Sequence, residues 1–347
     1  MENFGEKRDI LSMNLCELEA ALEEAGEKRF RAGQIYSWIH VKKVTEFSQM
    51  SNISLELRTR LDKNFCIKRL NVAKRLESCR DNTIKYLYGL NDGNHIESVL
   101  MEYEHGNSIC ISTQVGCKMG CKFCASAIAG FVRDLTPSEM LLQIYEAEAD
   151  SGRHIDNVVL MGIGEPLDNY DNVMRFLEII SDPKGRGMSL RHISLSTCGI
   201  VPKIYELAKR KTGLTLSVSR QSGYDEGRSE IMPVNRRWGI GELIEACRDY
   251  FKETGRRISF EYAVIEGVND SAEDAQRLHS LLGGMNCHVN LIPVNEVRET
   301  DFRADRKTAE RFKERLIKKG LNVTVRRTLG SDINAACGQL RREQEHC

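Results

Sequence analysis

Short apolar runs alternate with amphipathic segments over most of the chain after residue 105. The apolar runs have the length and residue types of buried strands, at 108–113, 157–162, 192–197, 214–219, 258–264, 288–293 and 322–327. The segments between them carry apolar residues at helical spacing, at 137–149, 173–180, 202–210, 240–253, 272–282 and 307–319. Such alternation predicts right-handed βαβ units and a parallel sheet. About six units favour a complete or partial (β/α)6-type barrel, whose chemistry collects at the carboxyl ends of the strands.

The residues before 105 follow two other patterns. Apolar residues between Leu15 and Leu22 recur at helical spacing, and 31–43 is a second amphipathic segment, so the N-terminal part is predicted to be helical. Two β-rich runs follow, at 83–90 and 95–103, with an Asn-Asp-Gly tight-turn signal between them.

These patterns divide the chain into four parts. We expect a small helical N-terminal domain at 1–60, a β-rich extension at 61–104, a βα barrel at 105–328 and a C-terminal tail at 329–347. A length of 347 residues suits one large catalytic domain with a smaller accessory one.

The composition is typical of a globular protein that buries a core. Apolar residues make up 41% and charged residues 29%. No stretch approaches the roughly 18 apolar residues of a membrane span, and the N-terminus lacks the apolar core of a signal peptide. We therefore expect a cytoplasmic protein with no membrane partner. As a separate expectation, it acts as a monomer.

Charge is balanced overall, with 50 basic and 50 acidic residues, so bulk charge gives no support for nucleic-acid binding. Locally, 58–75 carries seven basic residues and only Asp62 as an acidic one. They are Arg58, Arg60, Lys63, Lys68, Arg69, Lys74 and Arg75. A second basic group comprises Arg326, Arg327, Arg341 and Arg342. Such runs are usually solvated surface, and phosphate contact is the alternative.

Twelve cysteines in a chain of this kind indicate metal binding or catalysis rather than disulfides. Four of them stand in apolar segments and are predicted to be plain buried residues. These four are Cys66, Cys198, Cys247 and Cys287.

Three further cysteines, Cys117, Cys121 and Cys124, form a C-x3-C-x2-C spacing in a loop after the first barrel strand. A zinc site needs a fourth ligand nearby, and the residues just after Cys124 include neither Cys nor His. A [4Fe–4S] cluster normally takes four thiolates, so three leave one iron open. This spacing is typical of radical S-adenosylmethionine (SAM) enzymes, where the amino and carboxylate groups of SAM fill the open position.

Polar residues follow several predicted strands. Gly164 and Glu165 follow the strand at 157–162, in a GGE-like turn that commonly holds the SAM amino group. Ser196 ends the next strand, and Asn295 follows a later one. A carboxylate or short polar side chain at a strand end is also commonly a surface residue or a helix cap, so these residues alone leave both roles open.

Two more cysteines have open roles on spacing alone. Cys110 lies on the strand that leads to the cysteine loop, where a buried apolar role is the alternative. Cys337 lies in the tail, where it could equally be a spare surface thiol.

Six segments spread over the chain form a specific set. They are IESV at 96–99, CISTQVGCKMGCKFC at 110–124, MGIGEPLDNYDNV at 161–173, LSTCGIVP at 195–202, HVNLIPVN at 288–295 and GSDINAACGQL at 330–340. Through them the chain resembles the RlmN/Cfr family of radical SAM RNA methyltransferases over essentially its whole length. Within that family it resembles the enzymes that methylate carbon 2 of adenine in 23S ribosomal RNA and in transfer RNA.

Carbon 2 of adenine is not a nucleophile, so it cannot attack the methyl group of SAM directly. The resemblance implies a radical mechanism instead. Cys337 would take a methyl group from a first SAM by thiolate attack. The radical made from a second SAM at the cluster would remove a hydrogen from that methyl, and the carbon radical would add to the adenine. Glu97 would then remove the C2 proton. Cys110 would attack Cys337, forming a disulfide and freeing the product.

The resemblance also implies the other partners. SAM would be held by the turn at 164–165, by Ser196 and Asn295, and by the strand segment Ser217, Val218 and Ser219. In that segment the family usually shows Ser-Leu-His, so Ser219 replaces a histidine. The RNA would present an unstacked adenine, with the N-terminal domain and the basic run at 58–75 as candidates for backbone contact. An electron donor such as flavodoxin would reduce the cluster.

Two other functional interpretations compete with the adenine-C2 methyltransferase. A Cfr-like enzyme that methylates carbon 8 would use the same cysteines, but Pro166 and Val115 favour the C2 enzyme. A non-catalytic RNA-binding paralogue would have kept the fold and lost turnover. The replacement at Ser219 is its only support, and the intact cysteines argue against it.

Overall fold

The computed structural model describes residues 7–128, 130–294, 302–335 and 339–340. Contacts along the backbone group them into two compact units. One, which we call the helical unit, comprises 7–71, 135–153 and 171–190. The other, the sheet unit, comprises 72–134, 154–170 and the described residues from 191 onward. No helix among the described residues is long and apolar enough to cross a membrane.

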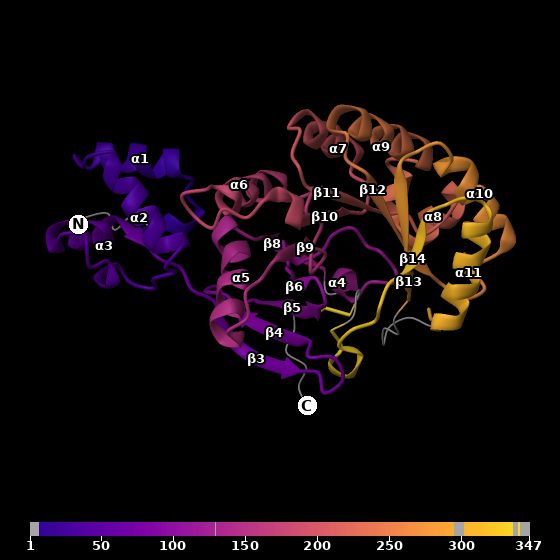
Figure 1. Ribbon diagram of the computed structural model, residues 1–347, viewed down its shortest axis with the longest axis horizontal. Coiled ribbons are helices and arrows are strands. Elements are labelled where there is room, and N and C mark those ends of the chain that lie inside the picture. The colour runs from indigo at the N-terminus through magenta and orange to yellow at the C-terminus, as the bar shows by residue number, and fades with distance from the viewer. Residues whose placement is uncertain (1–6, 129, 295–301, 336–338, 341–347) are drawn as a thin grey trace. The chain divides into compact units, whose positions relative to one another are not determined.

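The helical unit contains the three N-terminal helices and two helices from later in the chain (Figure 1). They are α1 Leu15–Glu24, α2 Phe30–His40, α3 Leu55–Asn64, α5 Pro137–Ser151 and α6 Tyr170–Ser181. A short parallel pair, β1 Arg8–Asp9 and β2 Phe65–Cys66, joins the two ends of the N-terminal segment. The predicted helical character of this segment is confirmed. The contacts, however, also group α5 and α6 with it, whereas the sequence pattern assigned both helices to the barrel.

Capping explains where α1 and α5 begin. Asn14 accepts a hydrogen bond from the backbone of Glu17, whose side chain accepts one in return from the backbone of Asn14. Thr136 and Glu139 form the same reciprocal pair at the start of α5, with Pro137 in the first turn, where its missing N–H costs nothing.

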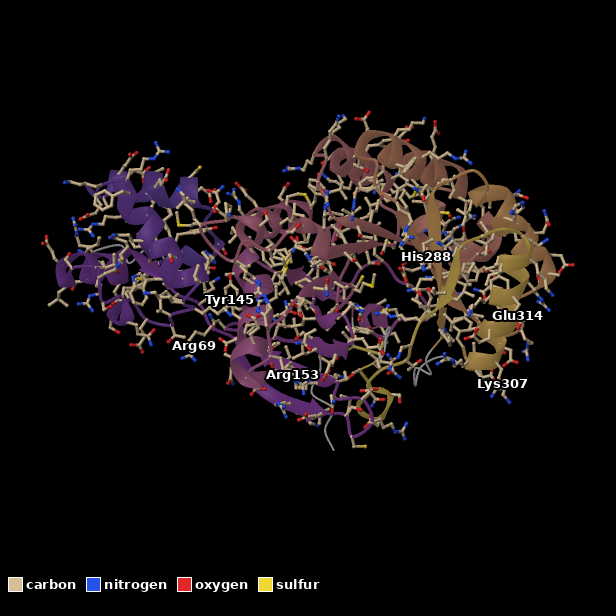
Figure 2. The ribbon with its side chains drawn as sticks, viewed as in Figure 1. Arg69, Tyr145, Arg153, His288, Lys307 and Glu314 are labelled. Atoms are coloured by element: carbon tan, nitrogen blue, oxygen red, sulfur yellow. The ribbon has the colours of Figure 1, made fainter. Side chains whose placement is uncertain are left out.

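Glu148 and His40 are among the buried polar residues of the helical unit. Glu148 accepts two hydrogen bonds of 2.7 Å from the guanidinium of Arg186 and is also paired with Lys43. His40 is buried on α2, with its Nδ1 3.2 Å from the hydroxyl of Tyr145 on α5. Tyr145 is labelled in Figure 2. Burial lowers the pKa of His40 to about 3, so the imidazole is neutral in the folded protein.

The sheet unit is built on one ten-stranded sheet, in the order β14-β13-β12-β11-β10-β9-β6-β5-β4-β3. The strands are β3 Asn71–Glu77, β4 Ile84–Gly89, β5 His95–Tyr103, β6 Gly106–Cys110, β9 Asn157–Leu160, β10 Ile193–Thr197, β11 Thr215–Ser219, β12 Ile258–Val264, β13 Cys287–Pro293 and β14 Val323–Val325. Neighbouring strands from β6 to β14 pair in parallel, while β4, β5 and β6 pair antiparallel.

This arrangement confirms the predicted α/β fold and its largely parallel sheet. Each strand expected from the apolar runs after residue 105 is present, and the runs at 83–90 and 95–103 become the hairpin of β4 and β5. The helices between the strands are α7 Val201–Lys209, α8 Asp225–Ile231, α9 Ile240–Thr254, α10 Ala272–Leu282 and α11 Arg306–Lys318. Figure 1 shows α9, α10 and α11 outside strands β12 to β14.

The sequence pattern did not predict the short elements around the cysteine loop. β7 Gln114–Gly116 and β8 Phe131–Asp134 form a separate antiparallel pair that closes the cysteine loop. The two strands are too short to show a periodic pattern of their own. The helix α4 Ala125–Ile128, inside the same loop, is a single turn.

His40 generates a prediction about acid stability. The unfolded chain takes up a proton near the ordinary histidine pKa of about 6.5, whereas the folded chain does not until about pH 3. The contribution of neutral His40 to the free energy of unfolding is therefore fully present above pH 6.5 and is lost as the pH falls toward 3. Between pH 7 and pH 5 we expect wild type to lose about 2 kcal/mol more unfolding free energy than His40→Phe.

Chemical denaturation of both proteins at several pH values measures this difference. His192→Gln, at an exposed histidine, is the control and should track wild type. Parallel pH curves for wild type and His40→Phe would show that His40 is protonated in the fold.

Candidate functional site

A cavity of about 990 Å³, counting its open mouth, lies in the sheet unit at the carboxyl ends of the parallel strands. Seven of the residues predicted from the sequence line it. They are Cys117, Cys121, Cys124, Gly164, Glu165, Ser196 and Ser219. Ser217 and Val218 are buried within β11 beside the cavity and do not line it. Asn295 lies outside the described residues.

The cysteine loop is closed by backbone contact between its two ends. The N–H of Cys117 donates to the carbonyl of Gly130 at 3.2 Å, and the N–H of Cys124 donates to Cys121 at 3.2 Å. Gly116 has a φ of +75°, and a Cβ there would lie 1.7 Å from the Gly130 carbonyl oxygen. Only glycine permits this approach.

The thiols of this loop lie in a dry environment. Burial raises the pKa of Cys117 to about 12, and burial raises that of Cys121 as well, with the neighbouring thiols adding to both shifts. A positively charged metal centre would offset this by favouring the thiolates. No three Cys, His, Asp or Glu side chains of the described residues are arranged to hold a single metal ion.

Glu165 is the buried carboxylate of the cavity. One oxygen accepts a hydrogen bond of 2.7 Å from the N–H of Cys198, and the other accepts one of 3.1 Å from Leu167. Burial raises the pKa of this carboxyl, and the two hydrogen bonds oppose that effect. A cationic group in the cavity would stabilise the carboxylate further, which is the chemistry expected for holding an ammonium.

Gln114 ties the cysteine loop to the turn that carries Glu165. Its side-chain oxygen accepts from the N–H of Glu165 at 2.8 Å, and its nitrogen donates to Asp134 at 2.8 Å and Asp168 at 2.9 Å. Gly164 is needed beside it, because φ is +107° and a Cβ would lie 2.6 Å from the Gln114 Cβ. Sequence reasoning missed Gln114.

Glu261 on β12 is a second buried carboxylate that lines the cavity and that sequence reasoning missed. One oxygen accepts from the Ser259 hydroxyl at 2.9 Å, and the other accepts from the Asn290 amide at 2.8 Å. The period-two polar positions within the strands at 258–264 and 288–293 were the signal that could have revealed it.

The polar row continues across the sheet. The hydroxyl of Thr324 lies 3.3 Å from Asn290 and 2.8 Å from Nε2 of His288, which is labelled in Figure 2. With Glu261, these side chains form a hydrogen-bonded row across β12, β13 and β14. The inner face of this part of the sheet is therefore polar rather than an ordinary apolar core.

Arg228, buried on α8, fixes the backbone at the ends of β10 and β11. It donates to the carbonyl of Cys198 at 2.6 Å and to that of Ser219 at 3.1 Å. The main chain at Ser219 is thus held by a contact that does not involve its side chain. Cys198, expected to be only a buried apolar residue, in fact lines the cavity.

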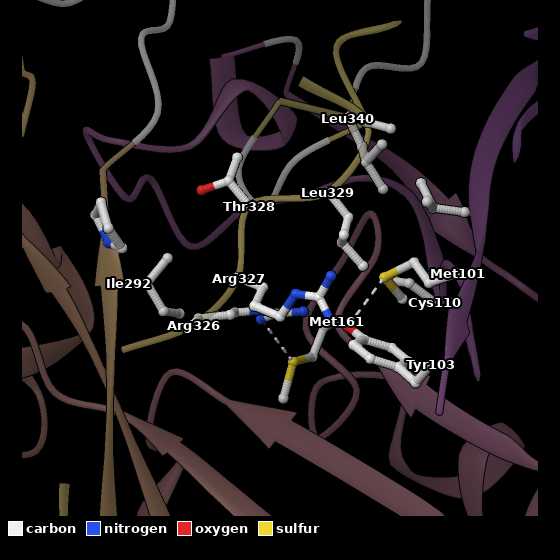
Figure 3. Close-up of a pocket in the computed structure, with 13 residues that line it drawn as sticks. Met101, Tyr103, Cys110, Met161, Ile292, Arg326, Arg327, Thr328, Leu329 and Leu340 are labelled. Carbon is white, nitrogen blue, oxygen red and sulfur yellow. Dashed lines mark hydrogen bonds between the residues drawn. The ribbon is translucent and has the colours of Figure 1, made fainter. Parts of the chain in front are cut away.

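A second cavity, of about 550 Å³, shares several wall residues with the first (Figure 3). The shared residues are Met161, Ile292, Arg326 and Leu340. Figure 3 shows the guanidinium of Arg326, a member of the second basic group, turned toward the Met161 sulfur, 3.7 Å away. Cys110 also lines the second cavity.

Strand register places Cys110 and Glu97 on one face. Val99 pairs directly with Cys110 on β6, and Glu97 precedes Val99 by two positions on β5. Side chains two apart on a strand point to the same side. Both predicted residues are buried, Cys110 at 8% exposure and Glu97 at 6%. The structure thus brings Glu97 to the face of the sheet that carries Cys110.

The C-terminal tail packs on the same face. Leu329, Ala335 and Leu340 belong to one apolar cluster with Cys110 and Val99. Leu340 is further held through its carbonyl, which accepts from the hydroxyl of Ser126 in the cysteine loop at 2.8 Å. Cys337 lies between Ala335 and Leu340 in sequence and outside the described residues. No disulfide joins any two of the described cysteines.

The remaining cysteines follow the sequence prediction in part. Cys247 and Cys287 are buried, as predicted. Cys66 is only half-buried, with its thiol near the carbonyls of Lys7 and Arg8, so the prediction for it was wrong.

Comparison with known proteins agrees with this geometry. Residues 8–67 match the family model of the ribosomal RNA large subunit methyltransferase N-terminal domain, and residues 111–279 match that of the radical SAM superfamily. A relative in Lachnoclostridium phytofermentans, named "Probable dual-specificity RNA methyltransferase RlmN", is 50% identical over 99% of this chain and 96% of its own. A relative of the same name in Clostridium novyi is 52% identical over 96% of this chain and 98% of its own.

A solved structure is similar over nearly the whole chain. It is the crystal structure of a radical SAM methyltransferase from Sphaerobacter thermophilus, with a TM-score of 0.92 and 41% identity. The alignment covers 97% of this chain and all of that one.

The bridging role of Gln114 generates a stability prediction. Gln114→Leu keeps the size of the side chain but leaves the N–H of Glu165 and two carboxylates without their amide partner. Because unsatisfied buried polar groups are costly, we expect a loss of about 2–3 kcal/mol in unfolding free energy. Gln114→Glu should lose at least as much unfolding free energy, because it places a third carboxylate beside those of Asp134 and Asp168. Thermal and chemical unfolding measure both, and a change under about 0.5 kcal/mol in Gln114→Leu would rule out the bridge.

Proposed function

The chain belongs to the RlmN family of radical SAM RNA methyltransferases, and from this we propose that it methylates carbon 2 of an adenine in 23S ribosomal RNA and in transfer RNA. One observation carries the proposal beyond family membership. Cys110 and tail residues on both sides of Cys337 in sequence share one apolar cluster, in a cavity adjoining the one lined by three thiols. A reaction that uses a radical source and a pair of cysteines requires these groups as neighbours.

The residues present fit the cofactors that the superfamily implies. Cys117, Cys121 and Cys124 line one cavity, and three thiolates from one loop suit a multi-iron cluster that keeps one iron open. Glu165 and Gly164 supply a buried carboxylate and a close backbone for the amino group of SAM. Ser196 and Ser219 would border the rest of SAM, together with Asn295, and the buried Ser217 and Val218 would support Ser219 from within β11. When bound, the cluster supplies the electron that cleaves SAM to a 5′-deoxyadenosyl radical.

The chain's own side chains would carry out the remaining chemistry. Cys337 accepts a methyl group from a first SAM through its sulfur and presents it as a thioether. Glu97 accepts the C2 proton of the adenine. Once the carbon carried by Cys337 is bonded to C2, Cys110 attacks the sulfur of Cys337. A disulfide forms, the bond between that sulfur and the carbon breaks, and the carbon takes up a proton to become the methyl group. Reduction of the disulfide by an external thiol restores both thiols. The disulfide is an intermediate of turnover, so the described structure need not contain it.

Ser219 in place of histidine affects how SAM is held. The Arg228 contact to the Ser219 carbonyl keeps the strand end in place, so we propose weaker ring contact to SAM and an intact reaction. We further propose a cytoplasmic monomer that takes electrons from a donor such as flavodoxin.

The cysteines give a direct test of the methyl-cysteine route. We expect Cys337→Ala to abolish formation of 2-methyladenosine while keeping its iron and its ability to cleave SAM to 5′-deoxyadenosine. Cys117→Ser should lose iron, SAM cleavage and RNA methylation together. Cys16→Ser changes an exposed cysteine on α1 and should match wild type. Anaerobic reconstitution, nucleoside mass spectrometry and iron analysis provide these measurements.

Three outcomes would contradict the proposal. Methylation retained in Cys337→Ala would exclude the methyl-cysteine route. A methyl group mapped to carbon 8 would identify a Cfr-like enzyme. A fully loaded cluster that never cleaves SAM would identify a non-catalytic RNA-binding paralogue.

The basic run gives a separate test of RNA contact. Several of its members are paired within the protein, Arg60 with Glu27 and Lys68 with Asp9. Lys63 and Arg69 are exposed, and we expect Lys63→Glu/Arg69→Glu to weaken RNA binding and to reduce the salt slope of log affinity by about 1 for each lost phosphate contact. Filter binding over a salt series measures both. Lys252→Glu, at an exposed site on α9, is the control, and equal slopes in all proteins would remove the run from the RNA interface.

A further inference from the structure

Lys85 on β4 is a buried lysine that neither the sequence prediction nor the proposed reaction uses. It is 8% exposed. Its ammonium lies 2.7 Å from Oε1 of Glu97, with the side chains of the pair 9% and 7% exposed. Lysines are rarely buried to this extent unless they are paired, because removing the ammonium from water is costly.

The strand register makes this contact. On the antiparallel pair β4 and β5, Lys85 is opposite Val99 and Leu87 is opposite Glu97. Lys85 and Glu97 are therefore diagonal neighbours on one face, within reach of a long side chain. Val99 pairs on its other side with Cys110. Lys85, Glu97 and Cys110 thus lie on the same face of three adjacent strands.

The same ammonium also contacts the tail. It donates to the carbonyl of Asn334 at 3.1 Å, three positions before Cys337 in the sequence. One nitrogen therefore bridges the carboxylate of Glu97 and the backbone of the segment that leads to Cys337.

A separate set of contacts holds the start of that segment. The N–H of Gly330 donates to Asp81 at 2.9 Å, and the carboxylate of Asp332 accepts from the Ser78 hydroxyl at 2.8 Å and from the Cys79 N–H at 3.1 Å. These contacts anchor the tail to the turn between β3 and β4 without touching Glu97. A change at Asp332 therefore serves as a control that loosens the tail without removing a contact of Glu97.

A purely structural explanation accounts poorly for a lysine here. Asp332 and Asp81 already anchor the tail, and an apolar residue of similar length would pack against Val99 at no desolvation cost. What an apolar residue cannot do is stabilise the negative charge of a buried carboxylate, which an ammonium at hydrogen-bond distance does.

We propose that Lys85 is a positioning residue of the methyl transfer, which keeps Glu97 ionised and oriented as a proton acceptor and holds it in register with the tail at Asn334. This inference rests on the proposed function, in which Glu97 receives the adenine C2 proton. Lys85 acts through Glu97 and Asn334, and it does not itself touch the reacting atoms.

The test uses the reconstituted full-length enzyme and RNA substrate with five variants: Lys85→Met, Lys85→Arg, Glu97→Gln, the double variant Lys85→Met/Glu97→Gln, and Asp332→Ala. For Lys85→Met we expect iron content and 5′-deoxyadenosine formation without RNA to stay within about twofold of wild type. Its kcat for RNA methylation should fall about tenfold or more, with the KM for RNA nearly unchanged, as expected when a proton acceptor is impaired. Lys85→Arg keeps the charge and should recover to within about fivefold.

The double variant separates positioning from general structural damage. If Lys85 acts through Glu97, adding Lys85→Met to Glu97→Gln causes no further loss of kcat. This comparison also holds if Lys85→Met alone is unstable, because the double variant has no unpaired buried charge. Losses that multiply would overturn the proposal, as would equal losses in Lys85→Arg and Lys85→Met.

Asp332→Ala separates the role at Glu97 from simple tethering of the tail. Hydrogen exchange at 330–335 should rise in both Asp332→Ala and Lys85→Met, whereas kcat should fall strongly only in Lys85→Met. A kcat loss in Asp332→Ala equal to that in Lys85→Met would overturn the proposal in favour of tethering alone. Full activity in Glu97→Gln would show that Glu97 is not the proton acceptor. A wild-type enzyme that methylates no adenine would instead refute the proposed function, while the exchange data would still report the contact.

Discussion

The side-chain amide of Gln114 is the interaction on which the rest of the site depends. It has three hydrogen bonds, to the backbone of Glu165 and to the carboxylates of Asp134 and Asp168. Through them the strand that leads into the cysteine loop, the strand that leaves it and the turn after β9 become one rigid group. An amide suits this position because it both donates and accepts, which neither a carboxylate nor an ammonium can do. One side chain therefore links both ends of the cysteine loop to the turn that carries the cavity carboxylate.

The fold could be predicted from the sequence to the extent that each element has its own pattern. The parallel strands and their helices show clean periodicity, and their positions agree closely with the structure. The pairing of β7 with β8 could not be predicted, since each strand is short and their partners are fixed by Gln114 and the backbone of Gly116. The grouping of α5 and α6 with the N-terminal helices was equally hidden, because periodicity shows that a helix has an apolar face and does not show what that face contacts.

The site was predictable where its residues form motifs and unpredictable where they act through geometry. The cysteine triplet and Glu165 stand in motifs, and the structure gathers them around one cavity. Glu261 and Lys85 stand in strands with no motif, and only the register shows that they point at the cavity and at Glu97. The replacement at Ser219 shows the reverse limit. The sequence shows the exchange of side chain, and only the structure shows that Arg228 holds the backbone carbonyl of Ser219.

The two adjoining cavities bear on how one tail could act first toward a cofactor and then toward a base. Leu340 borders both cavities, and its carbonyl accepts a hydrogen bond from Ser126 in the cysteine loop. Ala335 borders only the second cavity, beside Cys110, while Asn334 is held at Lys85. The described tail is therefore fixed at two points, one next to the cysteine loop and one next to Glu97. Described residues of the tail therefore lie at the two places between which the proposed reaction divides its chemistry, the cysteine loop and the carboxylate of Glu97.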